Sequence, residues 1–267
     1  MTRGPLKGRE PLQQQRFSTQ PLWVTVVKTS ANPTPCMTIE DPSDGVYNMA
    51  EDCRRLEIAE SSPDALLYVR LYRWDPPTAS IGRHQDPESA LDTESCAAEG
   101  VPIVRRPTGG RAVFHDRSEL TYSVVSNSPL LAGSGGILET YRRIAEVLQA
   151  GLSNIGVDTR LERTGTTLRN QSAPALRYPC FASASRHELL WGTRKIAGSA
   201  QRRLRRAVLQ HGSIPLEIQY GRMARILGTN EELLRDRMVS VNEAAGRCVD
   251  ITELTEALQK AFRNLLR

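Results

Sequence analysis

The chain has 267 residues, of which 39% are hydrophobic and 24% are charged, and its formal net charge is +5. No uncharged apolar run approaches the roughly 18 residues that a membrane-spanning helix requires, so we expect a soluble protein with no membrane contact. Aromatic residues make up only 5% of the chain. Nucleic-acid binding usually shows clustered basic residues interleaved with aromatic ones, so the composition argues against a nucleic-acid partner.

Cysteine and histidine usage limits the chemistry further. The five cysteines lie far apart, at positions 36, 53, 96, 180 and 248. Scattered cysteines in odd number are typical of free thiols in a reducing compartment, so we expect a cytoplasmic protein. The four histidines show no spacing that is typical of a zinc site, and we expect no metal.

The N-terminal residues differ from the rest of the chain. Residues 1–20 are polar, basic and without hydrophobic periodicity, which predicts a flexible basic tail. They lack the apolar core and cleavage site of a secretory signal, whereas a transit peptide stays an alternative because Glu10 is their only acidic residue. No convincing linker divides the remainder, so residues 21–267 are predicted to form a single catalytic domain.

Hydrophobic periodicity predicts strands and amphipathic helices in irregular alternation. The clearest strand covers 66–74, where apolar residues at 67, 69 and 71 alternate with Tyr68, Arg70 and Tyr72. In chain order we expect a strand at 23–27, a helix at 45–60, the strand at 66–74, a helix at 86–100, strands at 101–106 and 114–125, a helix at 137–155, an irregular segment at 160–180, strands with tight turns at 192–193 and 203–206 within 187–216, and a helix from 250 to the end. Without a strict βαβ rhythm, this pattern favours an α+β fold with helices packed on a sheet.

The most informative stretch is 105–116, with the sequence RRPTGGRAVFHD. A strand ends in two arginines and is followed by a Thr-Gly-Gly turn. Adjacent glycines allow successive backbone N–H groups to converge on one oxygen atom, as in anion and oxyanion sites. The spacing fits neither G-x-G-x-x-G nor a Walker A loop, so it does not indicate a nucleotide fold. A glycine-rich hairpin turn beside solvated arginines is the structural alternative.

A second candidate region contains Cys180 and Lys195. Cys180 ends an irregular polar loop, and Lys195 lies on a predicted strand beside Ile196 and Ala197. A nearby ammonium group lowers the pKa of a thiol and raises its thiolate fraction, and a partly desolvated amine can act as a base. The sequence does not bring the two side chains together. An inert loop cysteine and a lysine whose charged end reaches solvent therefore stay alternatives.

Together these stretches resemble the cofactor-transferase family of lipoate–protein ligases, octanoyltransferases and biotin–protein ligases. Residues 105–116 are similar to its R-R-x-[ST]-G-G-x-A-V-x-H-D signature, and 192–201 match G-x-[KR]-K-I-x-G-S-A-Q. The segments 48–52 (NMAED), 80–85 (SIGRHQ) and 209–216 (LQHGSIPL) match further elements in the same order. The resemblance implies a mixed, largely antiparallel central sheet flanked by helices, with an acyl tunnel beside the Gly-Gly loop.

Within the family, the sequence resembles the octanoyltransferase branch. The ATP-dependent ligases have a third glycine where this chain has Arg111, and G-N-L-N-[FY]-S where it reads ELTYS. The chain also places Cys180 just before the predicted hairpin, as in octanoyltransferases whose acyl enzyme forms on a cysteine in this loop. His187 stands where relatives tend to have an aromatic residue.

The resemblance implies transfer of an octanoyl group from octanoyl-acyl carrier protein to a lysine of a lipoyl-carrying protein. The recipient would be a glycine cleavage H protein or a lipoyl domain of a 2-oxoacid dehydrogenase. Cys180 maps onto the nucleophile and Lys195 onto the essential lysine, in a monomer that needs no cofactor because a thioester is already activated. The expected substrate-binding residues are Arg70, Arg106, Thr108, Gly109, Gly110, Arg111, His115, Gly198 and Ser199.

Several other interpretations stay open. A Cys-His-Asp triad with His115 and Asp116 is permitted by the spacing, but we favour a role for His115 in loop geometry or pocket lining. We expect His211 to be a hydrogen-bonded strand residue, and cysteines 36, 53, 96 and 248 to have no chemical role. The alternative functions are an ATP-dependent lipoate–protein ligase, an amidotransferase between lipoyl-carrying proteins, and a non-catalytic carrier-binding subunit.

Overall fold

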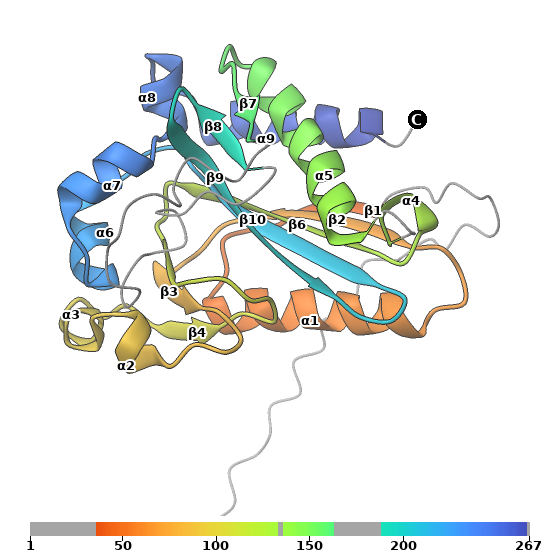
Figure 1. The fold of residues 1–267 in the computed structure, drawn as a ribbon, viewed down its shortest axis with the longest axis horizontal. Helices are drawn as coiled ribbons and strands as arrows, with labels where there is room; N and C mark the ends of the chain where they lie inside the picture. The colour runs from red at the N-terminus through yellow and green to blue at the C-terminus, as the bar shows by residue number, and fades with distance from the viewer. Residues whose placement is uncertain (1–35, 133–135, 163–187, 266–267) are drawn as a thin grey trace, which may run out of the picture.

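The computed structural model describes residues 36–132, 136–162 and 188–265, which form an α+β fold (Figure 1). The predicted strand at 23–27 and Cys180 lie outside the described residues. In chain order the elements are β1 (Cys36–Ile39), α1 (Gly45–Ser61), β2 (Leu67–Tyr72), β3 (Thr78–Ile81), α2 (Pro87–Ala90), α3 (Thr93–Ala98), β4 (Ile103–Arg105), β5 (Val113–His115), β6 (Glu119–Ser126), α4 (Pro129–Ala132), α5 (Gly136–Ser153), β7 (Arg160–Leu161), β8 (Leu189–Trp191), β9 (Arg194–Arg203), β10 (Val208–Pro215), α6 (Tyr220–Leu227), α7 (Glu231–Arg237), α8 (Val241–Ala245) and α9 (Ile251–Leu265).

A seven-stranded sheet with the order β1-β2-β6-β10-β9-β8-β7 forms the centre of the molecule. β1 and β2 are parallel, and the other neighbouring strands are antiparallel. The prediction of a mixed, largely antiparallel central sheet is therefore confirmed. The predicted tight turns are confirmed as well, because they join β8 to β9 and β9 to β10. Gly192, in the first of these turns, has a φ of +58°, which favours glycine.

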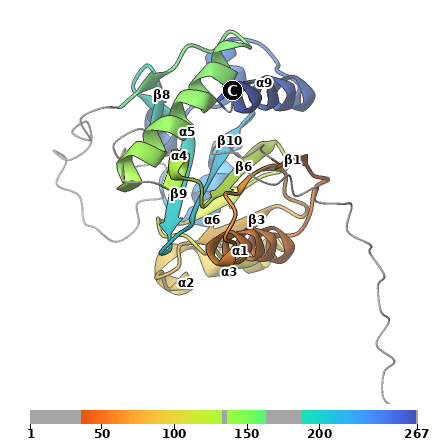
Figure 2. The ribbon, with the colours of Figure 1, turned by 90° about the vertical axis from the view of Figure 1, so that its right-hand side faces the viewer.

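The two faces of this sheet pack against different helices. α5 and α9 cover one face and α1 lies against the other (Figure 2). On β2, the predicted alternation is confirmed: residues 67, 69 and 71 belong to the core beneath α5 and α9. Tyr68, Arg70 and Tyr72 project towards the α1 side, because successive strand residues point to opposite faces. All six residues of β2 are buried.

A second sheet, which the sequence analysis did not predict, has three strands in the order β4-β3-β5. The predicted single strand at 114–125 was wrong in this respect. The chain turns at 116–118, and β5 joins the small sheet whereas β6 joins the large one. The physical reason is local, since the Glu119 amide donates to the Asp116 carbonyl and the Arg117 amide donates to the Asp116 side chain. Such a turn redirects the chain.

Most predicted helices are confirmed, with one correction. α1, α5 and α9 agree with the expected segments, and Asp44 caps α1 by accepting from the Tyr47 amide. The single helix expected at 86–100 was wrong, because Asp92 caps a new helix and divides the segment into α2 and α3. α6, α7 and α8 were not predicted. Among the described residues, no helix has the length and apolar character needed to cross a membrane.

Candidate functional site

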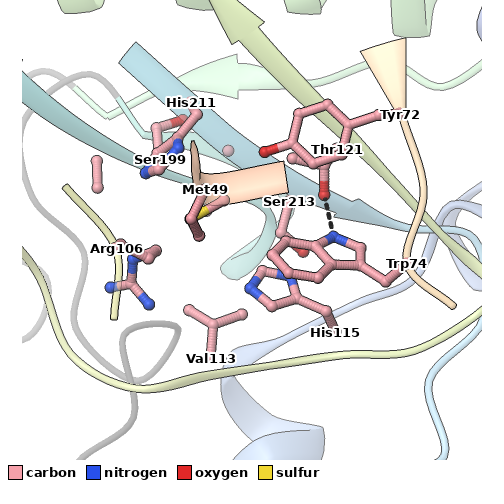
Figure 3. A pocket seen from close by; sticks show the side chains of 13 residues that line it. Met49, Tyr72, Trp74, Arg106, Val113, His115, Thr121, Ser199, His211 and Ser213 are labelled. Atoms are coloured by element: carbon pink, nitrogen blue, oxygen red, sulfur yellow. Dashed lines mark hydrogen bonds between the residues drawn. The ribbon is translucent and has the colours of Figure 1, made fainter. Parts of the chain in front are cut away.

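A cavity of about 350 Å³, including the part open to solvent, lies on the α1 side of the large sheet (Figure 3). Only Ser199 and Ala200 among its lining residues are partly exposed, so the cavity opens beside β9. Its lining is mainly apolar and aromatic, with polar groups from several strands. The lining residues are Met49, Tyr72, Trp74, Arg106, Val113, His115, Thr121, Gly198, Ser199, Ala200, His211, Gly212 and Ser213.

The side chain of Arg106 donates hydrogen bonds to the backbone of the Thr-Gly-Gly turn. Its Nη2 donates to the carbonyls of Gly109 and Arg111 at 3.2 and 2.7 Å. Its Nη1 donates to the Ser80 carbonyl at 2.8 Å and to Ser80 Oγ at 2.7 Å. Because the guanidinium fork binds both the turn and β3, Arg106 fixes the position of the loop relative to the small sheet.

The turn also lies against a second glycine-containing segment. A Cβ atom at Gly82 would stand 2.0 Å from the Gly110 carbonyl oxygen, so only glycine allows this approach. The Arg83 amide donates to the Thr108 carbonyl at 2.8 Å. Gly110 has a φ of +92°, in the region that side-chain-bearing residues rarely adopt. Both glycine-containing segments are therefore required for the shape of the loop.

A chain of buried hydrogen bonds reaches the turn from the large sheet. Arg70 Nη1 donates to Asp52 Oδ1 at 2.6 Å, and its other edge contacts both oxygens of Glu40 at 2.9 and 2.6 Å. Asp52 Oδ2 lies 2.8 Å from His211 Nδ1, and His211 Nε2 lies 2.7 Å from Thr108 Oγ1. We call Asp52, His211 and Thr108 the Asp52 chain. It connects α1, β10 and the loop.

Burial determines the charge state of this chain. Burial alone would raise the pKa of Asp52, but the hydrogen bond from His211 and the charge of Arg70 outweigh it and hold that pKa below its ordinary value. Burial lowers the pKa of His211, although the contact with Asp52 opposes this effect. At neutral pH the aspartate is therefore ionised and the imidazole is neutral.

A second chain of hydrogen bonds reaches the loop from the other side. His115 Nδ1 lies 2.7 Å from Glu119 Oε1, and His115 Nε2 lies 2.6 Å from Ser80 Oγ, which Arg106 also contacts. We call Glu119, His115, Ser80 and Arg106 the Glu119 chain. The imidazole ring stacks on Trp74 with ring centroids 3.9 Å apart. His115 lines the cavity, and its carboxylate partner is Glu119 rather than Asp116.

The indole of Trp74 is linked to the same carboxylate through Thr121, and Figure 3 shows the hydrogen bond between Trp74 and Thr121. Its Nε1 donates to Thr121 Oγ1 at 2.8 Å, and Thr121 Oγ1 donates to Glu119 Oε1 at 2.5 Å. The carboxylate of Glu119 thus orders both aromatic groups at this end of the cavity.

A bulge in β9 determines which way Lys195 projects. Leu189 pairs with Ala197, but the next residue, Leu190, pairs with Lys195, so β9 carries one extra residue, Ile196. Paired residues of neighbouring strands project from the same face, and successive residues alternate. Leu189 and Ala197 belong to the core beneath α5 and α9. Lys195 therefore projects from the opposite face, on which the cavity lies, and bulges often redirect a side chain in this way.

The ammonium group of Lys195 has a buried ionic partner. Its Nζ lies 2.6 Å from Glu188 Oε1, and both side chains are almost completely buried. Lys195 does not line the cavity itself, but Gly198 and Ser199 of the same strand do. Arg70 is also absent from the lining among the described residues, and it acts on the site through Asp52.

The remaining expected residues are distributed as follows. Arg106, His115, Gly198 and Ser199 line the cavity, and the Thr108–Arg111 turn borders it through the contacts of Arg106 and His211. Cys180 lies outside the described residues. The cysteines at 36, 53, 96 and 248 are free thiols. Among the described residues, no group of three or more acidic, histidine or cysteine side chains is arranged to hold a metal ion.

Three functional candidates were missed from the sequence. Asp52 and Ser80 lie within matched segments but received no role, and Glu119 served only to distinguish two branches of the family. The signal available for Asp52 and Ser80 is their position within matched segments, and for Glu119 it is the spacing of four residues from His115. The expectation for His211, a hydrogen-bonded strand residue, is confirmed.

Comparison with known proteins defines the class of this fold and site. Residues 44–263 match the family model of the lipoyl protein ligase A/B catalytic domain. The chain resembles a crystal structure of lipoate-protein ligase A bound with ATP, with a TM-score of 0.67, 25% identity, and coverage of 86% of this chain and 84% of that one. A lipoate protein ligase structure from T. acidophilum has the same fold, with a TM-score of 0.65 at 24% identity and the same coverage.

Curated relatives give a narrower comparison. Octanoyltransferase LipM of Kyrpidia tusciae is 39% identical over 82% of each chain. The LipM proteins of Symbiobacterium thermophilum and Staphylococcus aureus are 37% and 34% identical, over 83% and 82% of this chain and 82% of each relative. The chain belongs to the lipoyl protein ligase A/B catalytic-domain family. Within it, the predicted resemblance to the octanoyltransferase branch is confirmed.

Proposed function

We propose that this chain is an octanoyltransferase of protein lipoylation. It takes an octanoyl group from acyl carrier protein onto Cys180 and passes it to a lysine of a lipoyl-carrying protein, either a glycine cleavage H protein or a lipoyl domain of a 2-oxoacid dehydrogenase. The observation that carries the proposal is the similarity to LipM octanoyltransferases over about four fifths of both chains. The mainly apolar cavity beside the Thr-Gly-Gly turn supports it.

In the first half-reaction, the Cys180 thiolate attacks the carbonyl carbon of the octanoyl thioester. The phosphopantetheine thiolate leaves and takes a proton from the ammonium group of Lys195. An octanoyl-Cys180 thioester remains on the enzyme, so the transfer is divided into two easier steps. The buried contact between Lys195 and Glu188 supports this role, because it holds an ammonium group on the cavity face of the sheet.

In the second half-reaction, the ε-amine of the recipient lysine attacks the Cys180 thioester. Lys195, now neutral, takes the proton that the amine loses, and the Cys180 thiolate leaves. An amide forms, and both enzyme groups return to their starting states. The donor thioester is already activated, so the reaction needs no ATP.

We expect the Thr108–Gly110 turn to stabilise the oxyanion of both steps. The carbonyls of Thr108 and Gly109 accept from Arg83 and Arg106. Within the described part of the chain, the Gly109 and Gly110 amides donate to no other group. Two such donors suit an oxyanion, and loss of one typically lowers the rate by about 10²–10³-fold.

The test is intact-mass analysis after mixing the protein with octanoyl-acyl carrier protein. We expect a mass gain of one octanoyl group that hydroxylamine removes and that Cys180→Ala lacks. Cys248→Ala is the matched control, since Cys248 is an exposed free thiol, and it should acquire the group normally. A Cys180→Ala variant that keeps full transfer to the recipient overturns the proposal.

Two further mixtures distinguish the other family activities. Free octanoate with ATP and a recipient protein would release AMP if the chain were a ligase, and we expect none. An octanoylated lipoyl-carrying protein in place of acyl carrier protein tests the amidotransferase, and we expect it to be the poorer donor. A faster reaction with that donor contradicts the proposed substrate.

The proposal also covers organisation and location. We propose one catalytic domain over residues 21–267, acting as a monomer in the cytoplasm. The family match over 44–263 supports a single domain, and the free cysteines at 36, 53, 96 and 248 support a reducing compartment.

A further inference from the structure

Two chains of hydrogen bonds end on the same loop, and each contains a carboxylate, an imidazole and a hydroxyl group. The Asp52 chain reaches the loop at Thr108, and the Glu119 chain reaches it through Ser80 and Arg106. Their members come from α1, β3, β5, β6, β10 and the loop between β4 and β5, so the arrangement depends on both sheets.

The two ends of the Glu119 chain have opposite roles, because Arg106 carries only donors and the Glu119 carboxylate accepts. Ser80 Oγ accepts from Arg106 Nη1, and its second partner is His115 Nε2. Nδ1 of the same imidazole lies against Glu119, so both ring nitrogens of His115 are occupied by groups of the protein.

The Asp52 chain occupies its imidazole in the same way. Asp52 accepts from Arg70 at one oxygen, and the Tyr72 hydroxyl donates to the other at 3.2 Å. The neutral His211 donates from Nδ1 to Asp52 and therefore accepts from the Thr108 hydroxyl at Nε2. Each ring nitrogen of both imidazoles thus has a partner within the protein, and neither imidazole has a nitrogen left with which to take a proton from a substrate.

We propose that the two histidines are positioning residues rather than acids or bases: His211, ordered by Asp52, and His115, ordered by Glu119, hold the Arg106–Arg111 loop so that its Gly109 and Gly110 amides meet the acyl oxygen. This inference rests on the proposed octanoyl transfer and assigns a task to residues outside the Cys180–Lys195 pair. In each chain the carboxylate fixes the imidazole, the imidazole fixes a hydroxyl, and the hydroxyl anchors the loop.

The packing explains why two anchors are needed. Gly109 and Gly110 lack side chains and have no Cβ to limit their backbone, so the turn has no rigidity of its own. The Thr108 hydroxyl is completely buried, and Arg106 is 5% exposed. The loop is therefore bound at its start by Thr108 and across its span by Arg106, while Gly110 stays exposed at the tip.

The first test replaces the Thr108 hydroxyl by a methyl group of the same size. Thr108→Val should lower the kcat of octanoyl transfer about tenfold with KM close to the wild-type value, because the lost contact positions a group that acts in the transition state. Thr108→Ser restores the hydroxyl and should recover most of the lost rate. Thr255→Val is the matched control, since this buried threonine on α9 bonds only to the Ile251 carbonyl in the described chain. Full activity of Thr108→Val overturns the inference.

The second test asks whether the hydroxyl acts through His211. In a His211→Gln background, Thr108→Val should cost less than about twofold, because the two changes remove the same contact. If the two substitutions lower kcat independently, so that their effects multiply, the inference that Thr108 acts through His211 is overturned. Ser80→Ala should lower kcat in the same way as Thr108→Val, because it breaks the Glu119 chain at the corresponding hydroxyl.

A third measurement does not need catalysis. Nitrogen-15 spectra of the resting protein should show His211 as the neutral Nδ1–H tautomer, and the Gly109 and Gly110 amides should exchange faster in Thr108→Val. If the wild type transfers no octanoyl group but these signals are found, the proposed function fails and the positioning chains stand. An Nε2–H tautomer or an imidazolium of His211 at neutral pH overturns the positioning role.

Discussion

The two faces of the seven-stranded sheet are both buried, but they bury different chemistry. Beneath α5 and α9 the sheet presents aliphatic and aromatic side chains, including Val69, Val124 and Ile214. On the α1 side, the same strands present Arg70, Thr121 and His211, which are as deeply buried. One face resembles an ordinary core, whereas the other combines a network of hydrogen bonds around a cavity with a small apolar cluster that includes Leu56 and Leu209.

This difference shows which face of the sheet depends more on the exact placement of its side chains. Apolar side chains attract one another without direction, so the α5–α9 face tolerates a change of shape at a moderate cost. Buried polar groups need each partner in place, because an unpaired charge or donor in a low-dielectric interior is strongly unfavourable. We therefore expect substitutions on the α1 side to affect both stability and transfer, and substitutions on the α5–α9 side to affect stability alone.

The largest effect is expected from Arg70→Leu. It leaves the carboxylates of Asp52 and Glu40 without their shared cation, and breaking a buried pair in this way costs about 3–5 kcal/mol. Urea unfolding measures the loss. Arg54→Leu is the control, because Arg54 pairs with Glu51 on the exposed side of α1 and should cost below about 1 kcal/mol. Equal losses in the two variants would contradict a stability role for the buried ionic network on the α1 side.

On the opposite face, Leu148→Ala should lower the free energy of unfolding by about 2–5 kcal/mol. Leu148 on α5 is 1% exposed within the apolar core. The transfer rate per folded molecule should stay at the wild-type value, because no polar contact of the site is lost. Leu138→Ala on the same helix, where the side chain is 46% exposed, should change stability by no more than about 0.5 kcal/mol. A lower rate in folded Leu148→Ala would show that the faces are coupled.

The pH dependence of the free energy of unfolding tests the protonation of His211. Burial lowers its pKa, so the unfolded chain takes up this proton near pH 6.5 whereas the folded chain does so only at lower pH. The free energy of unfolding should therefore fall as the pH drops below about 6.5, by up to about 1.36 kcal/mol per pH unit, until the folded-state pKa is reached.

Urea unfolding between pH 7.5 and 5 measures this contribution, and His211→Gln should remove it. His84→Gln, at an exposed position, should keep the wild-type dependence. Identical pH profiles for His211→Gln and the wild type would contradict a neutral buried imidazole.

The smallest effect is expected from Trp74→Phe, at about 1 kcal/mol. The substitution keeps an aromatic ring against His115 but removes the donor to Thr121 Oγ1. Thermal unfolding of this variant, with the half-buried Trp191→Phe as reference, separates the hydrogen bond from the loss of indole area. No difference between the two would show that the Trp74 contact adds nothing at this end of the cavity.

Local patterns predicted much of this molecule. The alternation around Arg70 placed it on the correct face, and the RRPTGGRAVFHD stretch marked the loop of the site. The break after His115 and the second cap at Asp92 were missed because a short turn hardly disturbs the periodicity around it. The partners of His115 and His211 were also missed, since Glu119 and Asp52 approach them only when separate elements pack together.

The sequence alone determined the type of the longer elements such as α1, β2 and α5, the alternation of faces on β2 and the glycines that the loop requires, because these depend on the backbone and on near neighbours. Packing between elements decided which carboxylate orders which imidazole. It also decided that one extra residue in β9 turns Lys195 towards the cavity side, because a strand's register is set by its partner. Hydrogen-bond partners 159 residues apart, such as Asp52 and His211, meet only in the folded chain.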